Sequence, residues 1–267
     1  MKKLIAAAAL ILMLPKAYAA LPIDIEVNGN YIKTDVSPVN ADGTVLVPVR
    51  AAANALGCDD VVWDGENQTV TLDGGRVMFG IGDNFAYSDG KKTELPTAAR
   101  VIDSRAMIPI RFFAESFGAD VTWKGEMQTV VISLDGHEVE SEYVNYTNDD
   151  LEWLSKIVNA EAEGESMAGK KGVANVVLNR VDSEEFPDDI YNVIFDKKYG
   201  VQFTPVANGR IYNEPGTDSR IAAKSALNGD KNVGESLYFC NPIISTNTWI
   251  MKNREYYMTI GKHDFYL

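Results

Sequence analysis

The spacing of hydrophobic residues divides this chain into a strand-rich first half and a helix-rich second half. In the first half, residues 45–72 and 106–133 follow one pattern: a short apolar run, a Pro-x-Arg step, a helix-compatible stretch, a glycine, then Trp-x-Gly and alternating polar and apolar residues. Proline favours a helix start and glycine a helix end, while alternation of period two is typical of a half-buried strand. Each segment therefore predicts a strand, a helix and a hairpin.

The two segments are copies of each other. The offset between them is 61 residues and falls to 60 after one deletion. The shared positions are Pro48-Val49-Arg50 with Pro109-Ile110-Arg111, Gly57 with Gly118, Trp63 with Trp123, and Gln68-Thr69-Val70 with Gln128-Thr129-Val130. Identities in fixed order over such a length indicate a duplicated supersecondary unit.

The second half opens with an amphipathic helix. Thr147 is the expected N-cap, and Asp150 completes a capping-box pattern. At about 100° per residue the apolar positions share one face, and Glu161 falls in the middle of that face. The apolar positions are Leu151, Leu154, Ile157 and Val158.

A carboxylate on an apolar face points to acid–base chemistry. Desolvation favours its neutral form and raises its pKa, which is the state that a general acid needs near neutral pH. The alternative is that Glu161 ends the helix as an ordinary buried acid. Glu165 follows Gly164 and is the nearest possible second carboxylate.

Further elements complete an α+β prediction for the second half. Residues 167–181 are nearly apolar all round after Lys171, which predicts a buried helix. On it, Arg180 is expected to pair with a buried acid such as Glu161 or Glu165. Another helix is predicted over 218–227, closed by Gly229, and strands are predicted at 236–240, 248–251 and 255–260.

The N-terminus has the pattern of a secretory signal. Met1–Lys3 is basic, Leu4–Leu14 is apolar, and Ala17-Tyr18-Ala19 forms a small-x-small cleavage site. We predict cleavage before Ala20, an exported protein, and no attachment to the membrane after cleavage. No later stretch approaches the roughly 18 apolar residues of a membrane-spanning helix.

Composition narrows the classes of function. The chain is 46% hydrophobic and carries a net charge of −13, which argues against nucleic-acid binding and against charge-driven membrane binding. Two histidines and two cysteines cannot supply a three-histidine or four-cysteine zinc site, so we expect no metal and no cofactor. Cys58 and Cys240 are interpreted as small buried hydrophobes, with a disulfide between them possible but not implied.

The repeat, with its VPxR…G…W motif, resembles the copper amine oxidase N-terminal-like (stalk) domain over residues 23–134. No histidine lies between Leu21 and Asp135, so copper binding has no ligand support. The repeat's tryptophans and arginines (Trp63, Trp123, Arg50 and Arg111) either form a glycan platform or serve two small cores and internal pairs. The expected division is a signal peptide (1–19), this accessory domain (20–134), a polar linker (135–147) and a catalytic domain (148–267).

The second half resembles the spore cortex-lytic, cell wall hydrolase family. Four blocks occur in the family's order: VNAEAEGESMAGKKGVANVVLNRV, FPDDIYNVIF, QFTPVANGRIY and IGKHDFY. The resemblance implies a small lysozyme-like α+β catalytic domain whose catalytic glutamate is Glu161. It also implies a cleft-lining loop at Gln202, Phe203 and Thr204, and we add Tyr238 and Asn241 as candidates for substrate binding.

The implied function is cleavage of the MurNAc–GlcNAc glycan strand of peptidoglycan by a secreted, wall- or spore-associated enzyme. A lytic transglycosylase that leaves 1,6-anhydromuramic ends needs one carboxylate, whereas a muramidase-type hydrolase normally uses two, with Glu165 as the candidate partner. Two other readings stay open: an amidase that cleaves the peptide stem, and a non-catalytic wall-binding protein. The expected partner is the peptidoglycan glycan strand of either the spore cortex or the vegetative wall.

Overall fold

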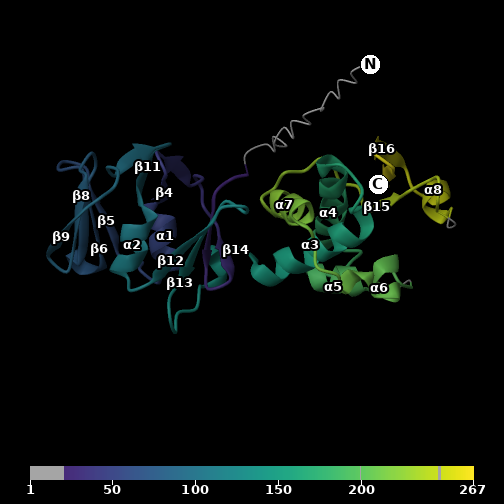
Figure 1. Ribbon diagram of the computed structural model, residues 1–267, viewed down its shortest axis with the longest axis horizontal. Coiled ribbons are helices and arrows are strands. Elements are labelled where there is room, and N and C mark those ends of the chain that lie inside the picture. The colour runs from purple at the N-terminus through teal and green to yellow at the C-terminus, as the bar shows by residue number, and fades with distance from the viewer. Residues whose placement is uncertain (1–20, 199, 246–247) are drawn as a thin grey trace, which may run out of the picture.

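The computed structural model describes residues 21–198, 200–245 and 248–267. The predicted signal peptide lies outside these residues. Within them, no helix is both long and apolar enough to cross a membrane. The first half is built from strands and the second mainly from helices, and the two lie side by side (Figure 1). The α+β prediction is therefore confirmed.

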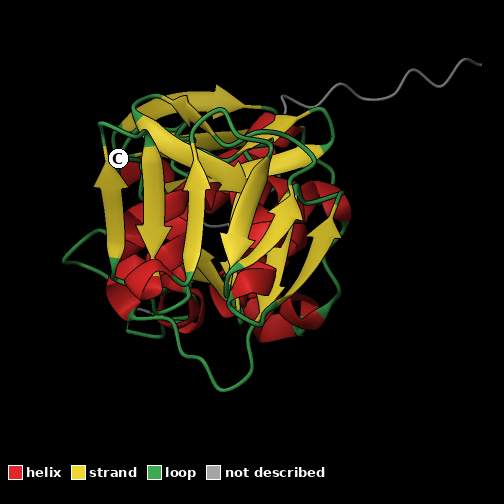
Figure 2. Ribbon diagram, turned by 90° about the vertical axis from the view of Figure 1, so that its left-hand side faces the viewer, coloured by secondary structure: helices red, strands yellow, loops and turns green. Residues whose placement is uncertain are grey.

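The first half contains three sheets and two short α-helices. When this half faces the viewer, its strands lie in front and most of the helices of the molecule lie behind them (Figure 2). One five-stranded sheet has the order β12-β13-β1-β2-β14, formed by Asp120–Lys124, Thr129–Ser133, Asp24–Val27, Asn30–Ile32 and Val144–Thr147. A four-stranded sheet has the order β10-β11-β4-β3, formed by Arg100–Ile102, Arg105–Pro109, Thr44–Pro48 and Val39–Ala41. The third sheet runs β5-β6-β7-β8-β9, formed by Val61–Asp64, Thr69–Leu72, Val77–Gly80, Phe85–Ser88 and Lys91–Glu94.

The duplicated unit is confirmed. One copy is β4-α1-β5-β6 and the other is β11-α2-β12-β13, with α1 at Val49–Ala55 and α2 at Ile110–Ser116. Each helix follows its proline directly, and each closing glycine, Gly57 and Gly118, has a positive φ. The copies meet through β4 and β11, where the equivalent residues Val47 and Ile108 pair with each other. An approximate twofold axis therefore passes between these two residues.

Residues 135–147 differ from the polar linker that we expected. They contain a 3₁₀ turn, η2 (Ser141–Tyr143), and the strand β14, which pairs antiparallel with β2. Tyr146 is buried and stacks on Tyr31, with ring centroids 4.3 Å apart. One buried aromatic side chain is too little periodicity to reveal a strand in the sequence, so β14 was missed.

The second half packs helices around a small antiparallel sheet of order β15-β17-β16. The helices are α3 (Asn148–Ala162), α4 (Met167–Val181), α5 (Ile190–Phe195), α6 (Thr204–Asn208), α7 (Thr217–Leu227) and α8 (Trp249–Asn253), with a 3₁₀ turn η3 (Arg210–Tyr212). The strands are β15 (Tyr238–Cys240), β16 (Tyr256–Ile260) and β17 (His263–Tyr266). A buried cluster between α3, α4 and α7 forms the core of this half.

Several local predictions are confirmed here and one is wrong. The capping box of Thr147 and Asp150 is present at the start of α3, and α4 is buried along most of its length. The predicted strand at 248–251 is instead part of α8, where Lys252 N donates to Thr248 O. Its Trp-Ile-Met run is uniformly apolar and lacks the alternation that identifies a half-buried strand.

Candidate active site

Glu161 lies in the last turn of α3, so it belongs to the helix on whose apolar face the helical wheel placed it. Its side chain is half-buried. Within the described residues, its carboxylate has no hydrogen-bond or ion-pair partner. Burial raises the pKa of Glu161 from 4.5 to about 7, and the positive charge of Arg210 partly opposes this rise. A carboxyl group in this setting holds its proton near neutral pH and releases it readily.

Arg210 belongs to the site, although sequence analysis did not select it. It begins η3, which packs against α3 together with α6. Its guanidinium lies 4.0 Å from the carboxylate of Glu163, an exposed residue at the end of α3. The only signal in the sequence was that Arg210 is the one basic residue of the QFTPVANGRIY block, and the helix packing that brings it toward Glu161 is not visible there.

Glu165 has a different role in the structure. Its Oε2 accepts a hydrogen bond from Lys262 N at 3.2 Å, in the turn between β16 and β17. Gly261 in that turn has a positive φ, and a Cβ there would stand 2.0 Å from the same oxygen. Glu165 therefore holds this turn, and its charge also acts on the nearby His263, a buried residue whose pKa is lowered mainly by burial.

The predicted cleft-lining loop divides into accessible and buried residues. Gln202 is half-buried and Thr204 is exposed at the start of α6, which packs on α3. Phe203 lies in the core with 3% of its surface exposed. It therefore fills the structural role that the sequence pattern could not separate from sugar contact, and its assignment to substrate binding is corrected.

Tyr238 and Phe203 lie together, on two sides of one buried cation. The guanidinium carbon of Arg180 is 5.1 Å from the ring of Phe203 and 5.4 Å from that of Tyr238. Tyr238 is nearly buried, and its hydroxyl accepts a hydrogen bond from Arg254 at 2.6 Å. Both aromatic side chains thus pack on Arg180, and the assignment of Tyr238 to substrate binding stays a prediction.

The expected pairing of Arg180 with an acid is wrong. Its Nε donates to Leu237 O at 2.8 Å, and no ion pair to it occurs among the described residues. Burial lowers its pKa to about 10. Aromatic faces stabilise a buried guanidinium without a carboxylate, so the sequence offered no way to choose between the two kinds of partner.

Asn241 and the cysteines also have structural surroundings. The Oδ1 of Asn241 accepts from Ile243 N at 3.0 Å and so closes a turn after β15. Cys58 and Cys240 are both buried and unbonded to each other, as expected for small hydrophobes, and burial raises the pKa of both thiols.

Comparison with known proteins supports both resemblances. Residues 26–132 match the family model described as the copper amine oxidase N-terminal domain. Residues 164–266 match the family model described as cell wall hydrolase. The two resemblances are therefore confirmed, in the order that the sequence predicted. Glu161 stands three positions before the second match begins.

The curated relatives are named spore cortex-lytic enzymes. That of Halalkalibacterium halodurans is 40% identical over 120 residues, covering 45% of this chain and 35% of the relative. That of Bacillus subtilis is 39% identical, covering 45% of this chain and 38% of the relative. The chain thus spans less than half the length of these relatives.

A solved structure shares a similar segment. It is described as the catalytic domain of a germination-specific lytic transglycosylase from Bacillus anthracis. It is 38% identical and covers 46% of this chain and 97% of its own, with a TM-score of 0.42.

Proposed function

We propose that the second half of this chain cleaves the MurNAc–GlcNAc glycan strand of peptidoglycan as a lytic transglycosylase. The protein is proposed to act after export, at the cell wall or the spore. The observation that carries the proposal is the half-buried carboxyl group of Glu161, which has no hydrogen-bond or ion-pair partner among the described residues and whose pKa is raised to about 7. The curated relatives, named spore cortex-lytic enzymes, support the substrate class.

Glu161 acts first as an acid and then as a base. Its carboxyl group protonates the glycosidic oxygen that links muramic acid C1 to the next sugar, and the C1–O bond breaks. The muramic acid C6 hydroxyl then attacks C1, and the Glu161 carboxylate takes the proton of that hydroxyl. The new bond closes a 1,6-anhydro ring, no water is consumed, and Glu161 recovers its proton.

The electrostatics favour a single carboxylate over a pair. In a retaining glycosidase the two carboxyl groups lie about 5–5.5 Å apart, and a charge at that distance raises the pKa of its neighbour. The groups that shift the pKa of Glu161 are its own burial and Arg210, and no other carboxylate is among them. Glu165, the candidate partner, is bonded to the backbone of the β16–β17 turn.

The decisive experiment is mass spectrometry of the products released from purified peptidoglycan. Muropeptides lighter by one water, with anhydromuramic ends, are expected from the wild-type chain. Glu161→Gln keeps the shape but cannot donate the proton, so the release should fall by about 10²-fold or more. Glu184→Gln, a change at an exposed residue just beyond the end of α4, is the control and should release products at close to the wild-type rate.

Other product patterns exclude the proposal. Reducing sugar ends would show hydrolysis, and free stem peptides abolished by a chelator would show a metal-dependent amidase. Wall binding without any product would show a non-catalytic protein.

A further inference from the structure

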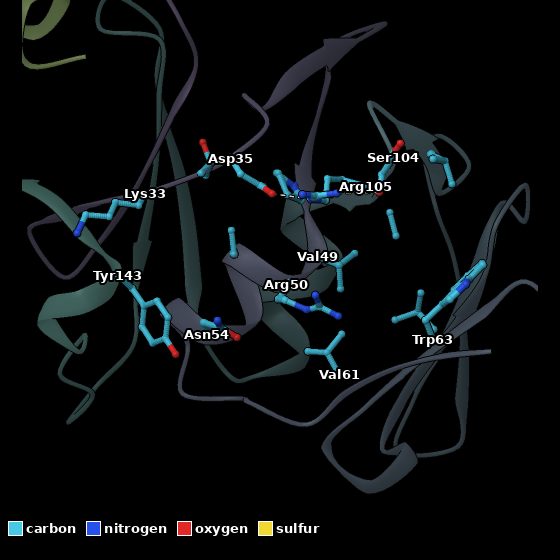
Figure 3. Close-up of a pocket in the computed structure, with 16 residues that line it drawn as sticks. Lys33, Asp35, Val49, Arg50, Asn54, Val61, Trp63, Ser104, Arg105 and Tyr143 are labelled. Carbon is cyan, nitrogen blue, oxygen red and sulfur yellow. Dashed lines mark hydrogen bonds and ion pairs between the residues drawn. The ribbon is translucent and has the colours of Figure 1, made fainter. Parts of the chain in front are cut away.

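A cavity of about 830 Å³ opens in the first half, and Glu161 is not among the residues that line it. It lies against α1, the β5–β6 hairpin and the turn that leads into β11. Its floor is apolar, with valine side chains from α1, β5 and β6. Its polar groups include Lys33, Asp35, Arg50, Asn54, Arg105 and Tyr143, with Trp63 at one end (Figure 3).

The cavity is positively charged although the chain carries a net charge of −13. Three cations line it against one carboxylate, that of Asp35, which is paired with Arg105 at 2.6 Å. The ammonium group of Lys33 donates to the carbonyl oxygen of Glu142 at 3.1 Å and has no carboxylate partner among the described residues. Arg50 extends from α1 into the cavity toward the side where Trp63 lies (Figure 3), and it has no hydrogen-bond or ion-pair partner in the part of the chain that the structure describes.

The second copy of the repeat shows what this arginine does when it is only structural. There, Arg111 pairs with Glu115 at 3.5 Å and donates to Val121 O at 3.2 Å. At the positions equivalent to Glu115 and Phe112, the first copy has Asn54 and Ala51. The first copy therefore lacks the acid that would neutralise Arg50, and the smaller Ala51, which lines the cavity, leaves room beside it.

Trp63 adds an accessible aromatic face. Its side chain is 49% exposed, so neither it nor its 40% exposed counterpart Trp123 sits in a small core, as one alternative held. The indole lies over Gly65, where a Cβ would stand 3.4 Å from its Nε1. An indole face packs well against the C–H face of a pyranose ring, and guanidinium groups bind carboxylates.

We propose that this cavity binds an acidic saccharide of the wall, with a sugar ring on Trp63 and a carboxylate of a muramyl peptide on Arg50. Lys33 lies in the same cavity for a second carboxylate of the stem. The site would hold the wall while the other half cuts it. The identification of the ligand as a wall glycan rests on the proposed function. The charge and the shape of the cavity are independent of that proposal.

The test uses the full chain carrying Glu161→Gln, so that binding is measured without cleavage. The probes are muramyl dipeptide by calorimetry and sedimentation with purified peptidoglycan. Arg50→Gln should weaken binding by about tenfold, the scale of one charge-assisted hydrogen bond. Trp63→Ala should also weaken binding by about tenfold, because it removes the apolar face that packs on the sugar ring. The matched changes in the second copy, Arg111→Gln and Trp123→Ala, should alter binding less than twofold, and thermal unfolding verifies that all variants are folded.

Equal affinity in all four variants, or equal binding of the uncharged chitotetraose, would overturn the proposal. Binding only to walls that retain teichoic acid would also overturn it, because a polyol phosphate would then be the ligand. Cleavage is assayed separately with Glu161 intact. Loss of binding in Arg50→Gln without any cleavage by the wild-type chain would support the cavity as a binding site and contradict the proposed enzyme. Cleavage by the wild-type chain with unchanged binding in Arg50→Gln would support the enzyme and overturn the binding site.

Discussion

The proposed chemistry of the second half depends on two opposing effects on the pKa of one carboxyl group, that of Glu161. Burial alone would hold the proton of Glu161 tightly, and the nearby positive charge of Arg210 makes its release easier. A group that must donate and then accept the same proton works best when neither state is strongly favoured. The opposing effects of burial and Arg210 meet that requirement.

Removing the charge of Arg210 should therefore move the pH profile. In Arg210→Gln the pKa of Glu161 rises further, because the influence that lowers it is gone. The acid then stays protonated to higher pH, so the alkaline limb of product release, expected near pH 7 in the wild type, shifts upward. Arg210→Lys keeps a positive charge and should shift the limb less. A profile unchanged in Arg210→Gln would contradict the assignment.

Because Glu161 is partly buried, its ionisation at alkaline pH lowers the free energy of unfolding. Because the pKa is about 7 in the folded chain and 4.5 for a glutamate side chain surrounded by water, the folded state binds this proton more tightly. The resulting stabilisation is complete below pH 4.5 and is lost as pH rises through 7, where the ionised group costs the folded state about 2 kcal/mol after allowance for solvent contact.

Glu161→Gln removes that cost. We expect the variant to exceed the wild type by about 2 kcal/mol in free energy of unfolding at pH 8 and to match it at pH 4.5. Urea denaturation at both pH values measures the difference, with Glu184→Gln as the exposed control. A difference that does not change with pH would show that the effect comes from packing and not from ionisation.

At the residue level, the sequence could predict the position of a side chain where that position depends on a single helix. The wheel placed Glu161 correctly because its neighbours on α3 define a face without reference to other elements. Phe203 was misassigned because its burial comes from contacts with other elements of the core cluster, which one segment of sequence does not reveal. A short polar-aromatic loop has the same composition whether its aromatic ring points inward or outward.

At the scale of elements, repetition and capping carried most of the information. The duplicated unit was recognisable because its proline, glycine and tryptophan recur at fixed spacing, and the start of α3 was recognisable from its capping box. What could not be predicted was the pairing of β14 with a strand more than a hundred residues earlier. Such long-range pairing leaves no local pattern.

A lysine at the start of α4 fixes the end of α3 that carries Glu161. Lys170, buried at the start of α4, donates to the carbonyl oxygens of Ala162 at 2.8 Å and Glu165 at 3.1 Å, and also to that of Glu163. These carbonyls follow the last turn of α3, where helical acceptors lack intrahelical donors.

Lys170→Met removes the buried ammonium donor from all three carbonyls, and only that of Ala162 keeps another donor, the amide of Glu165 at 3.0 Å. We expect a loss of about 2–4 kcal/mol in free energy of unfolding, since buried acceptors of charge-assisted hydrogen bonds are costly to leave unpaired, and a fall in kcat as Glu161 loses its position. Lys171→Met is the matched control: its ion pair with Asp230 is partly exposed and should contribute about 1 kcal/mol or less. Equal losses in both variants would remove the special role of Lys170.

At the scale of the whole molecule, the two halves are joined by more than the chain that connects them. Lys224 of α7 is fully buried and reaches the first half, where its Nζ lies 3.0 Å from Asp24 of β1. It also donates to Thr129 Oγ1 at 3.1 Å and to the carbonyl oxygen of Met127.

Asp24 accepts in addition from Tyr146 and from Asn228 at 2.9 Å. Deleting the first half would therefore leave a buried lysine and the edge strand β14 without partners, which is why point variants are the better test of the cavity.

The buried pair of Lys224 and Asp24 should decide whether the halves unfold together. Removing one member of a buried ion pair leaves the other uncompensated and costs about 3–5 kcal/mol. We expect Lys224→Met to separate a single unfolding transition into two, one for each half, measured by denaturation followed through circular dichroism. Adding Asp24→Asn should cost much less than the sum of the single changes, because the carboxylate is then no longer buried alone. A single transition at the wild-type midpoint in Lys224→Met would contradict this. It would show that the pairing of β14 and the Tyr31–Tyr146 stack are enough to couple the two halves, and so to fix the cavity and Glu161 relative to each other without the ion pair.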